Sequence, residues 1–212
     1  VDPTQYSRDF YKTVELWGGY QFGKFQLMGF VPYSFNRKVS DDGITRSDGL
    51  GDAMILVNYK IWTSTSLNKS ETASIRNDLW IGGGVKLPTG INRVDPGSPD
   101  FNIGDFNSQA GTGSVDYIFN ITHNLMWNKS GVVTNAAYRI NSANRQGYKF
   151  GARTYFNISY YYTFAVAQVK IKPNAGINYQ SNAINTFGNT PVEGSSGYNL
   201  NATAGLNFLY EK

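Results

Sequence analysis

Apolar and polar residues alternate along most of this chain, so that every second side chain is apolar over long runs. A period of two predicts β-strands with one face in an apolar medium, and no stretch shows the 3.6-residue period of an amphipathic helix. The alternating runs begin near Val14, Phe25, Ala53, Leu79, Val115, Val132, Phe150, Val169 and Tyr198. The pattern therefore predicts an all-β protein with about nine strands.

The predicted strands are long. Strands of soluble proteins usually have about five or six residues, whereas a tilted strand needs roughly 9–11 residues to cross a bilayer. No run approaches the roughly 18 apolar residues of a transmembrane helix. Strand length therefore favours a transmembrane antiparallel up-and-down β-barrel over a soluble β-sandwich or a lipocalin-like binder.

The connections between the predicted strands alternate between short and long, which is typical of outer-membrane barrels with short turns on one rim and long loops on the other. Residues 63–75 are the exception, since they form a longer link where a short one is expected. Residues 1–11 are expected in an outer loop that follows an earlier strand. The short turns are 23–24, 128–131 and 165–168, and the long loops are 36–50, 89–111 and 181–197.

The polar positions between the apolar ones are expected to line a water-filled lumen. In a packed core each unpaired polar group would cost a few kcal/mol, whereas a wet lumen accepts such groups. The charged candidates for the lumen are Lys86, Arg139, Lys149, Arg153, Lys170, Lys172, Glu15, Asp52, Asp78 and Asp116. Rings of Lys and Arg in a pore favour anions. The alternative, which stays open, is that these cations pair with the four acidic residues across neighbouring strands.

Aromatic residues near the short turns predict a girdle at that membrane boundary. They are Trp62, Trp127, Phe164 and the run Tyr160-Tyr161-Tyr162.

Composition excludes several kinds of chemistry. Only 16% of the residues are charged, against about 25% in soluble domains, which fits one apolar and one uncharged-polar surface. The chain has no cysteine and a single histidine, His123, at an apolar position of its run; disulfides and multi-histidine zinc sites are therefore excluded. We assign no catalytic residue, metal or cofactor and do not expect an enzyme. The net charge of +4 without a dense basic block indicates no nucleic-acid partner.

Three segments in order resemble a known outer-membrane family. They are 48–52 (DGLGD), 79–90 (LWIGGGVKLPTG) and 111–117 (GTGSVDY), and Phe30-Val31-Pro32-Tyr33 also fits. They are similar to the outer-membrane "transporter" β-barrel family related to the MetA-pathway phenol-degradation proteins, in its Bacteroidetes form. The resemblance implies a barrel for small, aromatic compounds with no catalytic residues, and it implies one earlier and about two further strands. Bacterial barrels close with even strand numbers, so about 12 strands are expected, with residues 1–212 a single barrel domain that is incomplete at both ends.

The sequence thus predicts a channel-like transporter of the Gram-negative outer membrane for small solutes, with aromatic and anionic compounds as candidates. The alternatives are a plugged structural or accessory barrel bound to a larger complex, and, more remotely, an outer-membrane enzyme. Residues 89–111 are expected to fold inward as a constriction. The expected partners are membrane lipid or lipopolysaccharide and a small-molecule solute, and a homo-oligomer or a larger outer-membrane assembly stays open.

Overall fold

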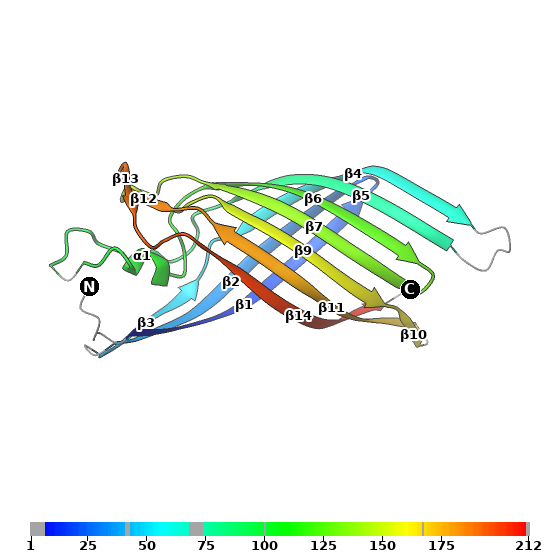
Figure 1. Cartoon of the computed structure of the whole chain (residues 1–212), viewed down its shortest axis with the longest axis horizontal. Coiled ribbons are helices and arrows are strands. Elements are labelled where there is room, and N and C mark those ends of the chain that lie inside the picture. Colours follow the sequence, from blue (N-terminus) through cyan, green and yellow to red (C-terminus); the bar gives the residue numbers. More distant parts are fainter. Residues whose placement is uncertain (1–6, 41–42, 68–73, 100, 167, 211–212) are drawn as a thin grey trace.

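The computed structural model describes residues 7–40, 43–67, 74–99, 101–166 and 168–210. Nine long strands follow one another in a single antiparallel sheet that curves into a half-barrel (Figure 1). The all-β barrel fold and the count of nine strands are therefore confirmed for this part of the chain. The long strands are β1 (Ser7–Phe22), β2 (Phe25–Ser40), β4 (Met54–Leu67), β5 (Ser74–Lys86), β6 (Asp116–Trp127), β7 (Ser130–Asn141), β9 (Arg153–Tyr162), β11 (Val169–Asn182) and β14 (Gly197–Tyr210).

Two short strands extend this sheet. β10 (Phe164–Val166) pairs with the start of β11, and β3 (Gly43–Leu50) pairs with the outer half of β2. The expectation of a loop is therefore wrong for residues 36–40 and 43–50, where β2 and β3 continue the sheet as an arm, and residues 41–42 lie outside the described part of the chain. The expectation of a loop at 1–11 is also wrong from Ser7 onward, where β1 already pairs with β2.

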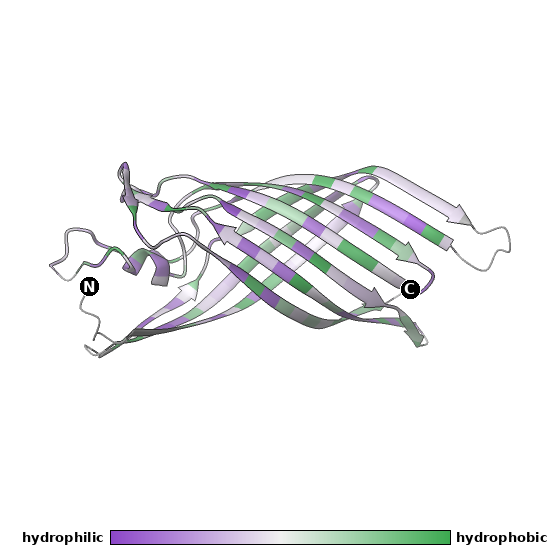
Figure 2. Cartoon of the chain, viewed as in Figure 1, coloured by the Kyte–Doolittle hydropathy of each residue, from purple (hydrophilic) through white to green (hydrophobic). Residues whose placement is uncertain are grey.

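Alternating side chains divide the sheet into two faces (Figure 2). On one face Leu16 and Phe208 are 77% and 67% exposed, whereas Lys86 and Asp116 on the other face are 3% and 1% exposed. Polar residues are therefore the sheltered ones and apolar residues the exposed ones, the reverse of a soluble protein. This inversion fits a sheet whose convex face meets an apolar medium.

A β-bulge in β4 adjusts the pattern near the short turns. The register with β5 shifts between Lys60 and Trp62, so that Ile61 and Trp62 are both exposed, at 43% and 49%. A bulge adds one residue to one strand, and here it keeps two consecutive apolar side chains off the polar face.

The predicted aromatic girdle forms in part. Trp127 lies 6.1 Å from Tyr160, and Tyr162 lies 4.8 Å from Phe164, between ring centroids. Tyr161 is an exception, because alternation turns it to the polar face, where its hydroxyl donates to Asn124 Oδ1 at 3.2 Å.

The long connections build a separate small structure at the other end of the sheet. Helix α1 (Asp105–Ser108) lies there with a three-stranded sheet of β8 (Tyr148–Lys149), β12 (Asn185–Phe187) and β13 (Thr190–Val192) (Figure 1). We call α1 and these three strands, with the residues that connect α1 to β5 and β6, the cap. Within the described residues no helix is long and apolar enough to cross a membrane.

Candidate functional site

A row of amide side chains crosses the polar face of β2, β4 and β6. Asn58 Nδ2 donates to Gln26 Oε1 at 3.1 Å, and Asn120 Nδ2 donates to Asn58 Oδ1 at 3.0 Å. The row passes over Gly82 of β5, where a Cβ would collide with the amide oxygens of both asparagines. The two amides occupy the space above Gly82, so this glycine leaves no opening in the polar face.

Next to this row lies a hollow of about 220 Å³. Lys60 Nζ stands 4.6 Å from the ring centroid of Trp80, one of the residues that line the hollow. Amide and hydroxyl groups can hydrogen-bond a small solute here, and the indole offers a flat apolar surface. The lining residues are Gln26, Asn58, Trp80, Thr122, Asn124 and Val133.

Lys86 sits at the outer end of β5 between two carboxylates. Its Nζ lies 2.7 Å from Asp52 Oδ2 and 2.9 Å from Asp116 Oδ2, and the side chains of all three residues are at most 4% exposed. It also donates to Thr112 Oγ1 and, at 3.2 Å, to the carbonyl of Ser114. We call Lys86, Asp52 and Asp116 the buried charge cluster.

The backbone around the buried charge cluster is close-packed. A Cβ at Gly90 would lie 2.6 Å from the carbonyl carbon of Gly51 and 2.7 Å from Gly111 Cα. Asp52 ties the same three segments together, since its carboxylate accepts from the amides of Gly90 at 3.0 Å and Thr112 at 2.8 Å. The three sequence segments that carry the family resemblance therefore meet at this one point.

Asp52, in the connection between β3 and β4, is held in its charged form. Burial alone would raise its pKa, but the hydrogen bond and charge of Lys86, with the amide and hydroxyl of Thr112, hold the pKa below its ordinary value of 3.8.

The cap is held by aromatic stacking and by bonds to distant strands. The ring of Phe106 in α1 stacks on Tyr148 of β8, with centroids 4.2 Å apart, and both side chains are fully buried. Asn36 of β2 donates to the carbonyl of Ser108 at 2.8 Å. On the other side, Asn144 Nδ2 donates to the carbonyl of Thr112 at 3.1 Å. The segment from β5 to β6 therefore reaches β2 on one side and the β7–β8 connection on the other.

The Tyr148 hydroxyl is sealed inside the cap. Burial raises its pKa above the ordinary 10.0, although bonds from Asn185 and Asn107 oppose this rise. Asn185 Nδ2 donates to the hydroxyl at 2.7 Å, which joins β12 to β8.

Of the two remaining acidic residues predicted to line the lumen, one is buried and the other is exposed. Asp78 is buried and accepts from Thr63 Oγ1 at 2.7 Å and from Arg76 Nε at 2.9 Å. Glu15 is exposed on β1, opposite Pro32.

The remaining predicted cations lie on the second half of the sheet, apart from Lys149, which belongs to β8 of the cap. Arg139 Nη2 donates to Tyr155 Oη at 2.9 Å, and Arg153 stands directly across from Arg139 in register. Lys172 Nζ lies 5.4 Å from the ring of Tyr161, and Lys170 precedes it by two residues on the same face of β11. The structure thus groups Lys86 with two acids and leaves four other predicted cations on strands that carry no acid.

Sequence patterns missed most of the contacts around these residues. Thr112 and Ser114 entered the sequence analysis only through the family resemblance, yet both hydrogen-bond to the buried charge cluster. Among the described residues, no group of three or more His, Cys, Asp or Glu could hold a metal ion. His123 Nε2 lies 3.3 Å from Asn77 Oδ1, close to the short turns.

No protein-family model matches this sequence. No curated protein matches it either. Among solved structures, it is similar to an outer membrane channel from Pseudomonas putida F1, with a TM-score of 0.59 and 16% sequence identity over 92% of this chain and 69% of that one. The chain therefore has the fold of an outer-membrane channel.

Proposed function

We propose that this chain forms most of the wall of a β-barrel channel in the outer membrane of a Gram-negative bacterium, and that the channel passes small solutes. The observation that carries the proposal is the inverted sheet, whose apolar face is exposed and whose polar face is sheltered. The fold shared with an outer-membrane channel supports it. Membership of the transporter family related to the MetA-pathway phenol-degradation proteins is part of this proposal, and so is the absence of an enzymatic activity.

Charge on the polar face favours an anionic solute. The buried charge cluster contributes no free cation, because two carboxylates enclose Lys86. The polar face of β7, β9 and β11 also carries Arg139, Arg153, Lys170 and Lys172, and these three strands contain no Asp or Glu. Cations that line a pore raise the local concentration of anions.

An aromatic solute is favoured by a different feature. The hollow beside Trp80 combines an indole ring with the amides of Gln26 and Asn58. Such a site fits a small ring that carries hydrogen-bonding groups, including the carboxylate of an aromatic acid.

Planar-bilayer recordings on the protein purified from outer membranes test this function. We expect the protein to conduct ions, and in a salt gradient we expect the sign of the reversal potential to indicate selectivity for anions. Replacing Arg139, Arg153, Lys170 and Lys172 together by Gln should shift the reversal potential toward cation selectivity, whereas Lys129→Gln in the exposed β6–β7 turn should not. Cation selectivity of the unmodified protein would rule out the anionic solute, and an absence of any conductance would rule out the open channel.

A plugged barrel with a structural or accessory role is the second candidate, and the cap favours it. The cap links β2 to the β7–β8 connection at the end of the sheet with long connections. Replacing residues 94–109 by a short Gly-Ser linker should raise conductance at least severalfold if the cap closes the lumen. Equal conductance with and without these residues would show that the cap leaves the path open.

A further inference from the structure

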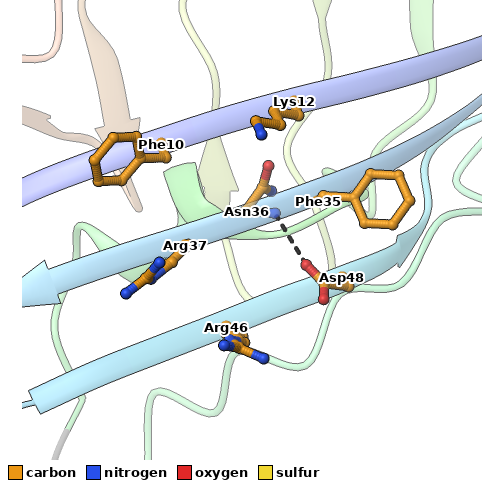
Figure 3. Close-up of a pocket in the computed structure, with 7 residues that line it drawn as sticks. All are labelled: Phe10, Lys12, Phe35, Asn36, Arg37, Arg46 and Asp48. Carbon is orange, nitrogen blue, oxygen red and sulfur yellow. Dashed lines mark hydrogen bonds between the residues drawn. The ribbon is translucent and has the colours of Figure 1, made fainter.

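A hollow of about 370 Å³ opens on the arm formed by β1, β2 and β3 (Figure 3). It lies at the end of the sheet that carries the long connections. None of the functions proposed for the polar face uses it. The lining residues are Phe10, Lys12, Phe35, Asn36, Arg37, Arg46 and Asp48.

The strand register arranges these side chains as two rows. Phe10, Arg37 and Arg46 stand across from one another on β1, β2 and β3, and Lys12, Phe35 and Asp48 form the next row. Cations and aromatic rings therefore alternate over the surface of the arm.

The two rows belong to the convex, lipid-side face of the sheet. Asn36 reaches the carbonyl of Ser108 in the cap, which marks its side of β2 as the inner one. Successive strand residues point to opposite faces, so Phe35 and Arg37 point outward. Figure 3 shows Lys12 and Arg46 beside them on the neighbouring strands.

The charges of this hollow are not balanced. Arg37 stands directly across from Arg46, and like charges in facing positions destabilise a sheet. The salt bridges among the described residues do not include Lys12, Arg37 or Arg46. Asp48 supplies one negative charge, and its Oδ1 accepts a hydrogen bond from the backbone N–H of Asn36 at 3.1 Å. Among the described residues that line the hollow, three positive charges against one negative leave a net +2 that an anion can neutralise.

We propose that this hollow binds the phosphorylated headgroup of a lipid in the membrane leaflet around this end of the barrel. The proposal rests on the membrane placement in the proposed function. Arginine binds phosphate oxygens in a two-pronged manner, and lysine supplies a further positive charge.

The surrounding apolar residues favour a lipid over a free anion. Phe10 and Phe35 are 39% and 45% exposed within the hollow, and Tyr33 packs 4.8 Å from Phe35. Along the same face Val14 and Val31 continue the apolar surface toward the middle of the strands, at 65% and 44% exposed. A lipid whose phosphate occupies the hollow would lay its acyl chains on this surface, whereas a free phosphate would gain nothing from it.

Native mass spectrometry of the detergent-solubilised protein tests the proposal with diphosphorylated lipid A as the probe. We expect the lipid to stay bound to the unmodified protein, and the triple variant Lys12→Gln, Arg37→Gln, Arg46→Gln to bind it roughly tenfold more weakly or worse. Dephosphorylated lipid A should bind weakly to both proteins. The matched control is Lys24→Gln with Lys129→Gln, which removes exposed cations from the short turns at the opposite end.

The outcomes separate this site from the channel. Equal binding of lipid A by the triple variant and the control would overturn the proposal. It would also be overturned if inorganic phosphate displaced the lipid and Phe10→Ala with Phe35→Ala left lipid binding unchanged, because the site would then take free anions. Conductance should be unchanged in the triple variant, and failure of the unmodified protein to conduct would count against the channel alone.

Stability provides a second measurement that does not require a bound lipid to be detected. In lipid-free micelles Arg37→Gln should leave the unfolding midpoint in urea unchanged or higher, because it removes a repulsion. In micelles with lipid A the unmodified protein should have the higher unfolding midpoint in urea, since a ligand stabilises only the protein that binds it. The proposal would be contradicted if lipid A did not raise the midpoint of the unmodified protein above that of Arg37→Gln.

Discussion

Replacing Lys86 by Met should be among the most damaging single changes in the sheet. The change leaves the carboxylates of Asp52 and Asp116 buried without the cation between them. Removing one partner of a buried ion pair costs about 3–5 kcal/mol. Asp52 keeps bonds from Gly90 and Thr112, so we expect the lower end of that range, about 3 kcal/mol of unfolding free energy.

Urea unfolding of the protein in detergent micelles, followed by tryptophan fluorescence, measures this loss. The triple variant Lys86→Met, Asp52→Asn, Asp116→Asn removes all three charges and should recover at least half of the loss, because neutral groups of similar size are tolerated where one unpaired charge is not. Lys129→Met in an exposed turn is the matched control and should stay within about 0.5 kcal/mol of the unmodified protein. A Lys86→Met protein as stable as this control, or a triple variant no more stable than the single one, would contradict a stabilising role for the buried charge cluster.

Three further predictions concern neighbouring features. Gly82→Ala should lower the unfolding midpoint in urea, because the added Cβ collides with the side-chain amides of Asn58 and Asn120. Gly18→Ala is the control, since its Cβ meets nothing within 4 Å, and it should leave the midpoint unchanged. Equal midpoints for the two variants would contradict the packing of the amide row over Gly82. Phe106→Ala should cost about 3–5 kcal/mol of cap stability and speed limited proteolysis in residues 91–99, and unchanged cleavage would show that the cap does not depend on this ring. The pKa of Asp52 in the folded protein lies below 3.8, so the stability that its carboxylate contributes is complete above pH 3.8 and is lost as the pH falls through the folded pKa. Asp52→Asn should therefore lower the free energy of unfolding more at pH 7 than at pH 3. An equal loss of unfolding free energy at the two pH values would contradict this prediction.

Alternation predicted the sheet because it is a local signal of the two environments on either side of a strand. The run from Tyr198 to Tyr210 is read correctly as β14 from its own residues alone. Alternation could not identify Asp52 and Asp116 as the ion partners of Lys86. Alternation assigns Lys86 and Asp116 to a face, but their pairing depends on the register of β5 and β6, and a long connection between two strands does not fix register as a tight turn does.

The cap escaped prediction for a related reason. α1 has only four residues and β8 only two, too few to show any period. The stacking of Phe106 on Tyr148 joins residues far apart in the chain through tertiary contacts only. In the arm, the end of β2 from Asn36 onward and the whole of β3 were predicted to be a loop, because Arg37 and Arg46 replace the apolar residues expected on the outer face. The departure from alternation at these positions is the same feature that suggests a phosphate-binding surface.

The direction of the strands bears on how a channel can close. Eight antiparallel pairings connect β1 to β14 through the nine long strands, so β1 and β14 run in the same direction. They cannot pair antiparallel with each other, yet a sheet inside a bilayer must leave no open edge because each unpaired backbone group costs several kcal/mol there. An odd number of additional strands between β1 and β14 satisfies both conditions, and three would give the 12 strands expected from the sequence. In the proposed channel, the wall described here therefore becomes a pore only with such strands in place, and the conductance test has to use the protein in its assembled form.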